Sequence, residues 1–425
     1  MEQLLHYTWK HKLYPLQSLQ TTLGEPVEVL DVGLHNTDAG PDFFNAKVKI
    51  GGILWVGNVE MHMRSSDWYR HGHHKDAHYD SVVLHVVEIA DQEVIRSNGE
   101  RLPQLCLQCP AQVKMHLEEL LATDRYPACY RLIPSLSPLF LHGWMAVLLN
   151  ERFEQKRLQF EARLLRTTSD WEAAFFVTLA RNFGFGINGD AFEKWASILP
   201  LHAVAKHRDQ LFQIEAIFFG VAGLLQDRAV EDPYYLSLQR EYHYLKQKFS
   251  LEEMDVSLWK FLRLRPCNFP HVRIAQLAYL YFHQRALFSK VMETTDIRQL
   301  TDWMRCGVSD YWKTHYNFKR SSAASDKKLS DKSIHLVFIN TFATVLYAYG
   351  LSRAEESLCA RAAALLEKLK AEDNYIVRMW REVGVEVETA ADSQALIQLK
   401  KEYCDPKKCL FCRIGYLYLK ELPKK

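Results

Sequence analysis

Residues 43–63 read FFNAKVKIGGILWVGNVEMHM, and this stretch decides the fold of the N-terminal part of the chain. Residues 43–50 alternate apolar and polar side chains, which is the period of a half-buried β-strand. Gly51 and Gly52 follow as a two-residue turn signal, and residues 53–63 have the composition of a returning strand. We therefore predict a β-hairpin over residues 43–63.

The flanking sequence extends this hairpin into a sheet. Three further runs have strand character, namely residues 27–34 (VEVLDVGL), 82–89 (VVLHVVEI) and 93–96 (EVIR). The second of these is apolar almost throughout, which is typical of a central strand that is covered on both faces. Residues 1–20 carry apolar side chains at helical spacing and predict a helix before the sheet.

After about Pro110 the apolar period becomes helical and stays so to the end of the chain. The sequence therefore predicts an α+β fold with two parts. Residues 1–110 form a mixed β-sheet module, and residues 111–425 form a large all-helical region with a cysteine-containing C-terminal tail. A chain of 425 residues is long enough for more than one hydrophobic core.

Composition excludes a global attraction to nucleic acid or to membranes. The formal net charge is only +2, from 53 basic and 51 acidic residues, so binding to an anionic partner must rest on a local patch. The first residues lack the basic start and long apolar run of a secretory leader, and no apolar run approaches the length of a membrane span. We expect a cytoplasmic protein without a membrane partner, whose nine cysteines are reduced.

Histidines and carboxylates are concentrated between residues 31 and 87, where seven of the 18 histidines lie. Asp42 opens the first strand of the predicted hairpin, and Glu60 and His62 stand two residues apart on the second, so they share one face of it. Because the open end of the first strand lies beside the far end of the second, we expect Asp42 and Glu60 to converge. Two carboxylates with water are the usual ligands of Mg²⁺ or Mn²⁺, and such an ion can activate water.

Pro41-Asp42, the apolar strand that follows and Glu60-Met61-His62 resemble the motif of the PD-(D/E)xK nuclease superfamily. The resemblance implies a restriction-endonuclease-like mixed sheet, a metal-dependent phosphodiesterase acting on DNA or RNA, and metal ligation by Asp42 and Glu60. His62 stands where that family has lysine, so it would position water or stabilise charge. The superfamily often adds an upstream helical acid, for which Glu2 is the nearest candidate.

Four further residues of the cluster are supporting candidates for such a site: His35, Asp38, Asp67 and His74.

Two alternative interpretations of the sequence remain open. The run His71-x-His73-His74-x-Asp76-x-His78, with His62 and His85, offers imidazoles for a histidine-rich zinc hydrolase or a structural zinc site. In the other, the protein is a non-enzymatic scaffold or adaptor that binds a protein partner through its helical region, and the metal site is structural or vestigial.

A possible second metal site lies near the C-terminus, where Cys404, Cys409 and Cys412 are closely spaced. Thiolates favour Zn²⁺ or an iron–sulfur cluster. No fourth ligand is evident beside them, although Cys106 and Cys109 could supply one or two.

Nearly the whole chain also resembles an uncharacterised bacterial family, domain of unknown function 2851. The runs His35–Phe43 (HNTDAGPDF), Trp55–His62 (WVGNVEMH) and Ser66–Trp68 (SDW) carry this resemblance. It implies no known activity.

Overall fold

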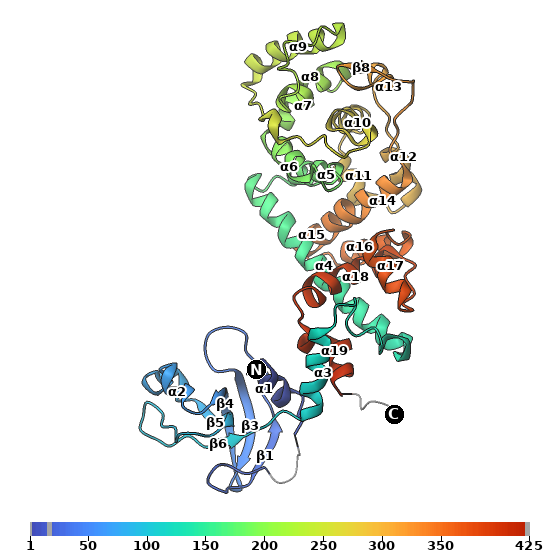
Figure 1. Cartoon of the computed structure of the whole chain (residues 1–425). Helices are drawn as coiled ribbons and strands as arrows, with labels where there is room; N and C mark the ends of the chain where they lie inside the picture. The colour runs from blue at the N-terminus through green and yellow to red at the C-terminus, as the bar shows by residue number, and fades with distance from the viewer. Residues whose placement is uncertain (1, 15–18, 421–425) are drawn as a thin grey trace. The chain divides into compact units, whose positions relative to one another are not determined.

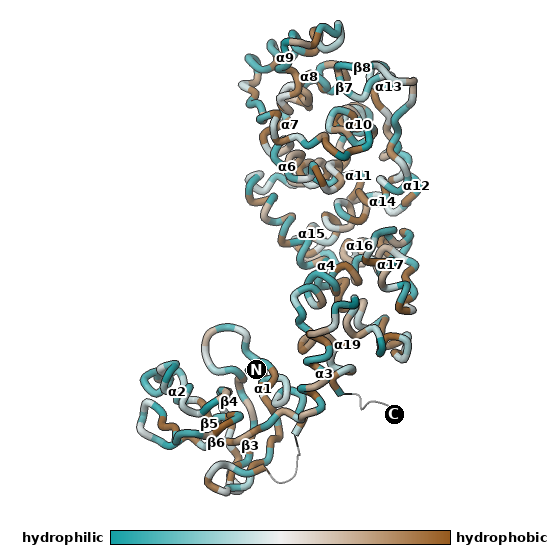
Figure 2. The backbone as a smooth tube through the Cα atoms, viewed as in Figure 1, coloured by the Kyte–Doolittle hydropathy of each residue, from teal (hydrophilic) through white to brown (hydrophobic). Residues whose placement is uncertain are grey.

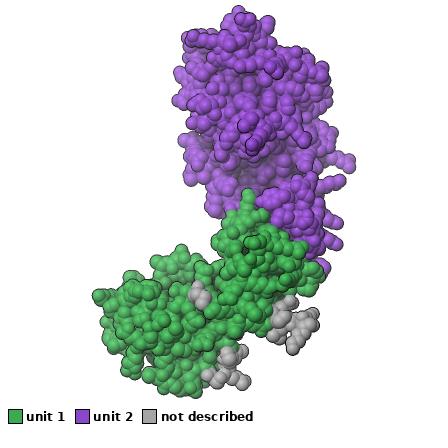
Figure 3. Space-filling model, viewed as in Figure 1, with its two compact units in different colours: residues 1–136, 400–425 green, residues 137–399 purple. Residues whose placement is uncertain are grey.

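The computed structural model describes residues 2–14 and 19–420 (Figure 1). The chain forms two compact units (Figure 3): unit 1 comprises residues 1–136 and 400–425, and unit 2 comprises residues 137–399. The predicted architecture is confirmed, because a mixed sheet is followed by a large helical region. The units divide at residues 136 and 400, whereas the sequence places a boundary near residue 110, so the C-terminal segment belongs with the sheet.

One sheet of six strands forms the centre of unit 1. Its strands are β1 (Val27–Asp31), β2 (Leu34–His35), β3 (Phe43–Ile50), β4 (Ile53–Arg64), β5 (Val82–Ile89) and β6 (Gln104–Cys106). Their order is β1-β3-β4-β5-β6, with β2 paired to β3 beside β1. The predicted hairpin is β3–β4, which is antiparallel with Ile50 opposite Ile53, whereas β4–β5 and β5–β6 are parallel.

Helix α1 (Glu2–Lys10) packs on one face of this sheet through Leu5 and Trp9, which share a core with Val59 and Met61 of β4. It is shorter than the predicted helix over residues 1–20, and residues 15–18 of that range lie outside the described residues. The parallel connection from β4 to β5 carries α2 (Asp67–Arg70) and two short 3-10 turns, His73–Lys75 and Ala77–Tyr79.

The prediction of a strand at residues 93–96 is wrong. Ile95 makes only an isolated bridge to Arg101, and the strand after β5 is β6. The apolar side chain of Val94 instead packs with Trp68 and Leu102 in a small separate core. This segment therefore helps to bury Trp68 rather than extending the sheet.

Unit 1 also contains α3 (Ala111–Ala122), the π-helical turn Lys400–Cys404, α19 (Arg413–Lys420) and two more 3-10 turns, Ile133–Ser135 and Cys409–Phe411. Leu419 of α19 shares an apolar cluster with Leu120 of α3 and Leu4 of α1. Packing against α1 and α3 explains why the C-terminal segment belongs to unit 1.

Unit 2 is helical apart from the short hairpin β7–β8 (His315–Asn317 and Arg320–Ser321). Its helices are α4 (Pro138–Arg166), α5 (Trp171–Phe183), α6 (Gly189–Ile198), α7 (Leu201–Lys206), α8 (Leu211–Val221), α9 (Pro233–Phe249), α10 (Pro270–His283), α11 (Leu287–Glu293), α12 (Ile297–Met304), α13 (Asp310–Lys313), α14 (Asp331–Val337), α15 (Ala343–Arg353), α16 (Glu356–Lys368), α17 (Tyr375–Glu382) and α18 (Ala390–Leu399). A single large apolar core joins most of them.

Hydropathy along the chain is shown in Figure 2. Within the described residues, the run Asp331–Arg353, which joins α14 to α15 through a π-helical turn, is long and apolar enough to cross a membrane by length and composition. About two thirds of its most apolar window (67%) is buried inside the protein, so packing in the core of unit 2 accounts for this composition.

Gly57 sets the distance between β4 and β5. A Cβ atom at this position would lie 2.3 Å from Cγ1 of Val83 and 2.8 Å from the carbonyl oxygen of Ser81. We therefore expect Gly57→Ala to destabilise unit 1 by about 1–3 kcal/mol through overpacking. Gly143→Ala is the control, because nothing lies within 4 Å of that Cβ position in α4. Thermal unfolding followed by circular dichroism measures both, and an unchanged melting temperature for Gly57→Ala would contradict the assignment.

A buried carboxyl group in unit 2 makes stability depend on pH. Burial raises the pKa of Glu215 to about 7, although the Tyr234 hydroxyl donates a hydrogen bond to it. The folded state therefore holds this proton more tightly than the unfolded state, so stability is greatest below the ordinary carboxyl pKa and falls as the pH rises to about 7. We expect the loss to reach at most about 3 kcal/mol. Glu215→Gln should remove it, which urea unfolding at pH 5 and pH 8 measures; equal pH dependence in both proteins would refute the prediction.

Candidate metal site

The sheet brings the predicted acids together. Asp42 directly precedes β3, and the antiparallel register sets Phe43 opposite Val59, so Asp42 lies next to Glu60. Because side chains alternate along a strand, Val59 and Met61 join the core against α1, whereas Glu60 and His62 project from the opposite face. The parallel register of β4 and β5 sets His85 beside Glu60.

Backbone hydrogen bonds hold the two carboxylates side by side. The Asp42 amide donates to Oε2 of Glu60 at 3.2 Å, and the Met61 amide donates to Oδ2 of Asp42 at 2.9 Å. Burial raises the pKa of both carboxyl groups, and the charge of Asp42 raises that of Glu60 further. Two acids in this position repel each other when both are ionised. A cation between them would relieve that repulsion.

Three imidazoles form the second part of the site. His62 lies with Nδ1 2.9 Å from Nε2 of His85 and with Nε2 3.0 Å from Nδ1 of His71. His62, His71 and His73 each place one ring nitrogen within 4.8 Å of the others, which makes them a group able to hold a metal ion. Burial, with the neighbouring imidazoles, lowers the pKa of His62 far below its usual value. His62 is therefore neutral at pH 7, the form that ligates metals.

The imidazoles and the carboxylates form one site. Oε1 of Glu60 lies 3.4 Å from Nε2 of His73 and 3.6 Å from Nε2 of His62. The ring of His73 packs on Tyr79, with centroids 3.8 Å apart, and burial lowers the pKa of His73 to about 4. Trp68 of α2 contacts both His73 and His85. The crossover between β4 and β5 therefore supplies both His71, which is exposed, and His73, which Trp68 and Tyr79 partly cover.

Helix α1 adds a histidine that the sequence reasoning missed. Nε2 of His6 lies 3.5 Å from Oδ2 of Asp42, and the charge of Glu2 acts on both His6 and Glu60. The signal available was the helical spacing of Glu2 and His6, four residues apart on one face of the predicted helix. Glu2 and His6 are far in the sequence from the histidine and carboxylate cluster, so this spacing did not connect them with the site.

A groove of about 330 Å³ adjoins this side of the site. Its wall is formed by residues of α1, of the segment after β2 and of the C-terminal segment: Glu2, Gln3, His6, Tyr7, Lys10, His35, Asn36, Thr37, Leu410 and Phe411. Lys10 and His6 therefore face the same space, next to Asp42.

The structure gives the supporting candidates different positions. His35 lies beside the site, because its ring contacts Phe43 and His6. Asp38 is exposed, and its backbone is bonded to the Asn36 side chain. Asp67 accepts the Arg64 amide and pairs with Arg70 at 2.8 Å, so it shapes the start of α2.

Of the remaining histidines in the run, neither joins the imidazole group. His74 packs on Tyr69, and His78 forms an exposed pair with Asp76 at 2.7 Å.

The C-terminal cysteines lie in a different part of unit 1. Cys404, Cys409 and Cys412 line one cavity, and Cys129 lines it with them. Cys109 does not line this cavity, although it packs against the same apolar cluster as Cys129 and Cys409, and Cys106 is exposed on β6.

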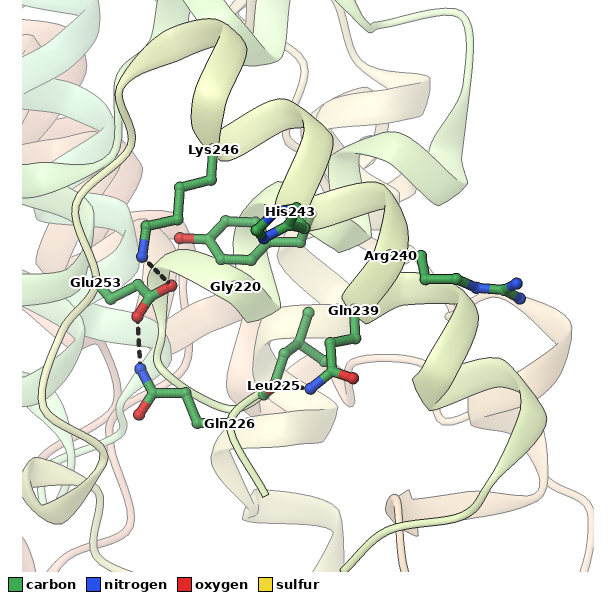
Figure 4. A pocket seen from close by; sticks show the side chains of 9 residues that line it. Gly220, Leu225, Gln226, Gln239, Arg240, His243, Lys246 and Glu253 are labelled. Atoms are coloured by element: carbon green, nitrogen blue, oxygen red, sulfur yellow. Dashed lines mark hydrogen bonds and ion pairs between the residues drawn. The ribbon is translucent and has the colours of Figure 1, made fainter. Parts of the chain in front are cut away.

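The cavities of unit 2 lack a comparable group of ligands. Figure 4 shows one of about 450 Å³ beneath α9, where Lys246 and Gln226 each donate to Glu253 at 2.6 Å. The acid in this cavity is therefore already paired with a cation and an amide. Another, of about 610 Å³, is lined by His271, by Asp227 and Lys319, which pair at 2.9 Å, and by mainly apolar side chains.

Comparison with known proteins identifies a family and no activity. Nothing among curated proteins or among solved structures matches this chain. A family model described as "Protein of unknown function (DUF2851)" matches residues 2–375. Since this match covers most of the 425 residues, the chain belongs to the DUF2851 family, whose function is unknown.

Proposed function

We propose that unit 1 is a metal-dependent phosphodiesterase that cleaves nucleic acid. The observation that carries this proposal is the pair of carboxylates, the buried Glu60 and the half-buried Asp42, held side by side near the three imidazoles of His62, His71 and His73. A sheet that brings two acids together, with nitrogen ligands at the same point, is suited to a divalent cation.

The residues fit such an ion. Among the described residues, the ion pairs of Asp42 and Glu60 are to histidines alone, and burial depresses the pKa of His6, His62 and His73. No lysine or arginine therefore compensates the two acids. Asp42, Glu60, His62, His71 and His73 offer both oxygen and nitrogen atoms. This mixed set favours Mn²⁺ or Zn²⁺ over Mg²⁺, which prefers oxygen ligands and water.

His62 takes a different part here from the lysine of the resembling motif. Its two nitrogens contact His85 and His71, and its lowered pKa keeps it uncharged. It therefore serves to hold the ion and to fix the other rings, because it carries no positive charge with which to stabilise a phosphoryl group.

An ion bound at these residues would lower the pKa of a bound water and offset charge on the phosphoryl oxygens. His6 is placed to receive the proton from that water. Its Nε2 has no hydrogen-bond partner among the described residues, faces Asp42 and is neutral at pH 7. A neutral imidazole at the edge of a site is a suitable general base.

The neighbouring groove fits a nucleic-acid chain. Lys10 provides a cation for a backbone phosphate, Asn36 provides polar atoms, and Phe411, which is 46% exposed, provides a ring on which a base can stack. Contacts of this kind are made to the phosphate backbone and to the flat face of a base, which all nucleotides share, so we expect little sequence preference.

A second candidate function is a zinc hydrolase of another ester or amide. The three imidazoles within 4.8 Å favour it, because three nitrogen ligands with an open position are typical of catalytic zinc. A scaffold with a structural metal is the non-enzymatic alternative. Metal preference and substrate scope separate the three.

The first test compares the thermal stability of the protein with and without metal. Excess Mn²⁺ or Zn²⁺ should raise the melting temperature of the wild type, since an ion at 100 times its Kd stabilises by about 2.7 kcal/mol. Glu60→Gln should lose this increase, and its metal-free form should be at least as stable as the wild type because the repulsion with Asp42 is gone. Metal affinity should rise with pH, because the ion competes with protons on acids whose pKa is raised.

The matched control for metal binding is Glu28→Gln, an exposed acid of β1 on the same sheet. Calorimetric titration should give wild-type affinity for it. Equal metal stabilisation of Glu60→Gln and Glu28→Gln would show that the ion binds elsewhere.

Cleavage of labelled single- and double-stranded DNA and RNA tests the activity itself. With Mn²⁺ or Zn²⁺ present, we expect cleavage that chelator abolishes and that Asp42→Asn and Glu60→Gln each reduce at least about 100-fold, since losing a ligand costs more than losing the 10–100-fold contribution of an outer residue. Glu28→Gln should keep full activity. Metal binding without cleavage of any nucleic acid would leave the zinc hydrolase of another substrate or the scaffold.

A further inference from the structure

Four cysteines from two distant parts of the sequence meet in unit 1. Cys129, Cys404, Cys409 and Cys412 all line one cavity of about 250 Å³. Cys129 follows α3, and the other three lie between the π-helical turn at Lys400–Cys404 and α19. No disulfide joins any of the nine cysteines, all of which are described.

Local backbone structure presents these thiols to the cavity. Cys409 begins a 3-10 turn that ends at Cys412, whose amide donates to the Cys409 carbonyl at 3.3 Å. A Cβ atom on Gly415 would lie 2.1 Å from that carbonyl oxygen, so α19 approaches the turn closely only because residue 415 is glycine. Lys407, with φ of 54°, reverses the chain between Cys404 and Cys409.

The wall of this cavity carries charged side chains beside the four thiols. They are two cations, Arg125 and Lys407, and two acids, Asp124 and Asp405, and Asp405 is paired with Lys400. Cys129 interacts electrostatically with Cys404, Cys409 and Cys412, so the four side chains lie near one another.

We propose that Cys129, Cys404, Cys409 and Cys412 bind a thiophilic metal centre, either an iron–sulfur cluster or a zinc ion. Four thiolates are a donor set that suits both. Among the described residues, the ligand nitrogens of His62, His71 and His73 lie within 4.8 Å of one another. The four cysteine sulfur atoms do not form so close a group. One zinc ion, with bonds of about 2.3 Å, requires these side chains to rotate inward, whereas a cluster binds them to separate iron atoms.

The position of this centre gives it a structural role. Cys129 precedes the point where the chain leaves unit 1 at residue 136, and the other three cysteines follow its return at residue 400. A metal bound to all four ties the outgoing and returning chain together. It also fixes the turn that carries Leu410 and Phe411 into the groove beside Asp42.

Metal analysis of protein purified without oxygen tests the proposal independently of any catalytic activity. We expect either visible absorption with iron and acid-labile sulfide in equal amounts, or one zinc ion per chain above that held by the imidazole–carboxylate site. Cys129→Ser and Cys404→Ser should each lose this centre. Cys109→Ser is the matched control, because Cys109 is half-buried in unit 1 but does not line the cavity, and it should keep the wild-type metal content.

Colour and acid-labile sulfide distinguish an iron–sulfur cluster from zinc. Loss of either metal centre in Cys129→Ser supports the proposal. Equal metal content in Cys129→Ser and wild type would overturn it. If the serine variants do not fold, wild-type protein stripped of metal is loaded with Co²⁺, because thiolate ligands give a sulfur-to-cobalt charge-transfer band that imidazole and carboxylate cannot. A wild type that shows neither this band nor iron–sulfur absorption after reconstitution would refute the centre.

Discussion

The pairing of β4 with a different partner on each side is the constraint on which unit 1 depends. It is antiparallel to β3, which brings Asp42 beside Glu60, and parallel to β5, which brings His85 beside Glu60. A parallel pair requires a crossover connection. That crossover is the segment which carries His71 and His73. The same pairing therefore places the acids, aligns the buried imidazole and delivers the two remaining rings, while Val59 and Met61 on the other face of the strand anchor it in the core.

Burial makes this arrangement costly in the absence of a cation. Glu60, His62 and His85 are buried at one point and Asp42 is half-buried beside them, and burial shifts the pKa of each toward the neutral form. Packed apolar side chains would fill the same position at lower cost. Trp68 and Tyr79 nevertheless pack against the rings of His85 and His73, so these two histidines are built into the unit. This is the pattern expected where a site holds an ion, and it underlies the proposed function.

The sequence predicts the sheet well because its signal is local. Alternation over residues 43–50 and the Gly51-Gly52 turn are enough to define the β3–β4 hairpin, and that register alone places Asp42 near Glu60. Three-dimensional packing decides the rest. His6 reaches Asp42 only because α1 lies on the sheet, and Cys129 reaches the C-terminal cysteines only because the chain returns to unit 1 at residue 400. His71 and His73 join His62, whereas His74 and His78 do not, because the 3-10 turns of the crossover direct these side chains differently. The spacing of the histidines in the sequence does not reveal this.

The return of the chain also explains how a unit at the N-terminus comes to depend on residues near the C-terminus. Unit 2 is inserted between Leu136 and Lys400, and a chain with both ends of an insertion in one unit must hold those ends together. Leu4, Leu120 and Leu419 do so through apolar contact, and this contact brings Phe411 to the groove of α1. Apolar packing alone restrains a short terminal helix weakly, because helices of this length are marginal without tertiary support. Metal ligation by cysteines on both segments would supply the missing restraint. Because the turn that carries Cys409 also carries Leu410 and Phe411, the same ligation would fix one wall of the groove.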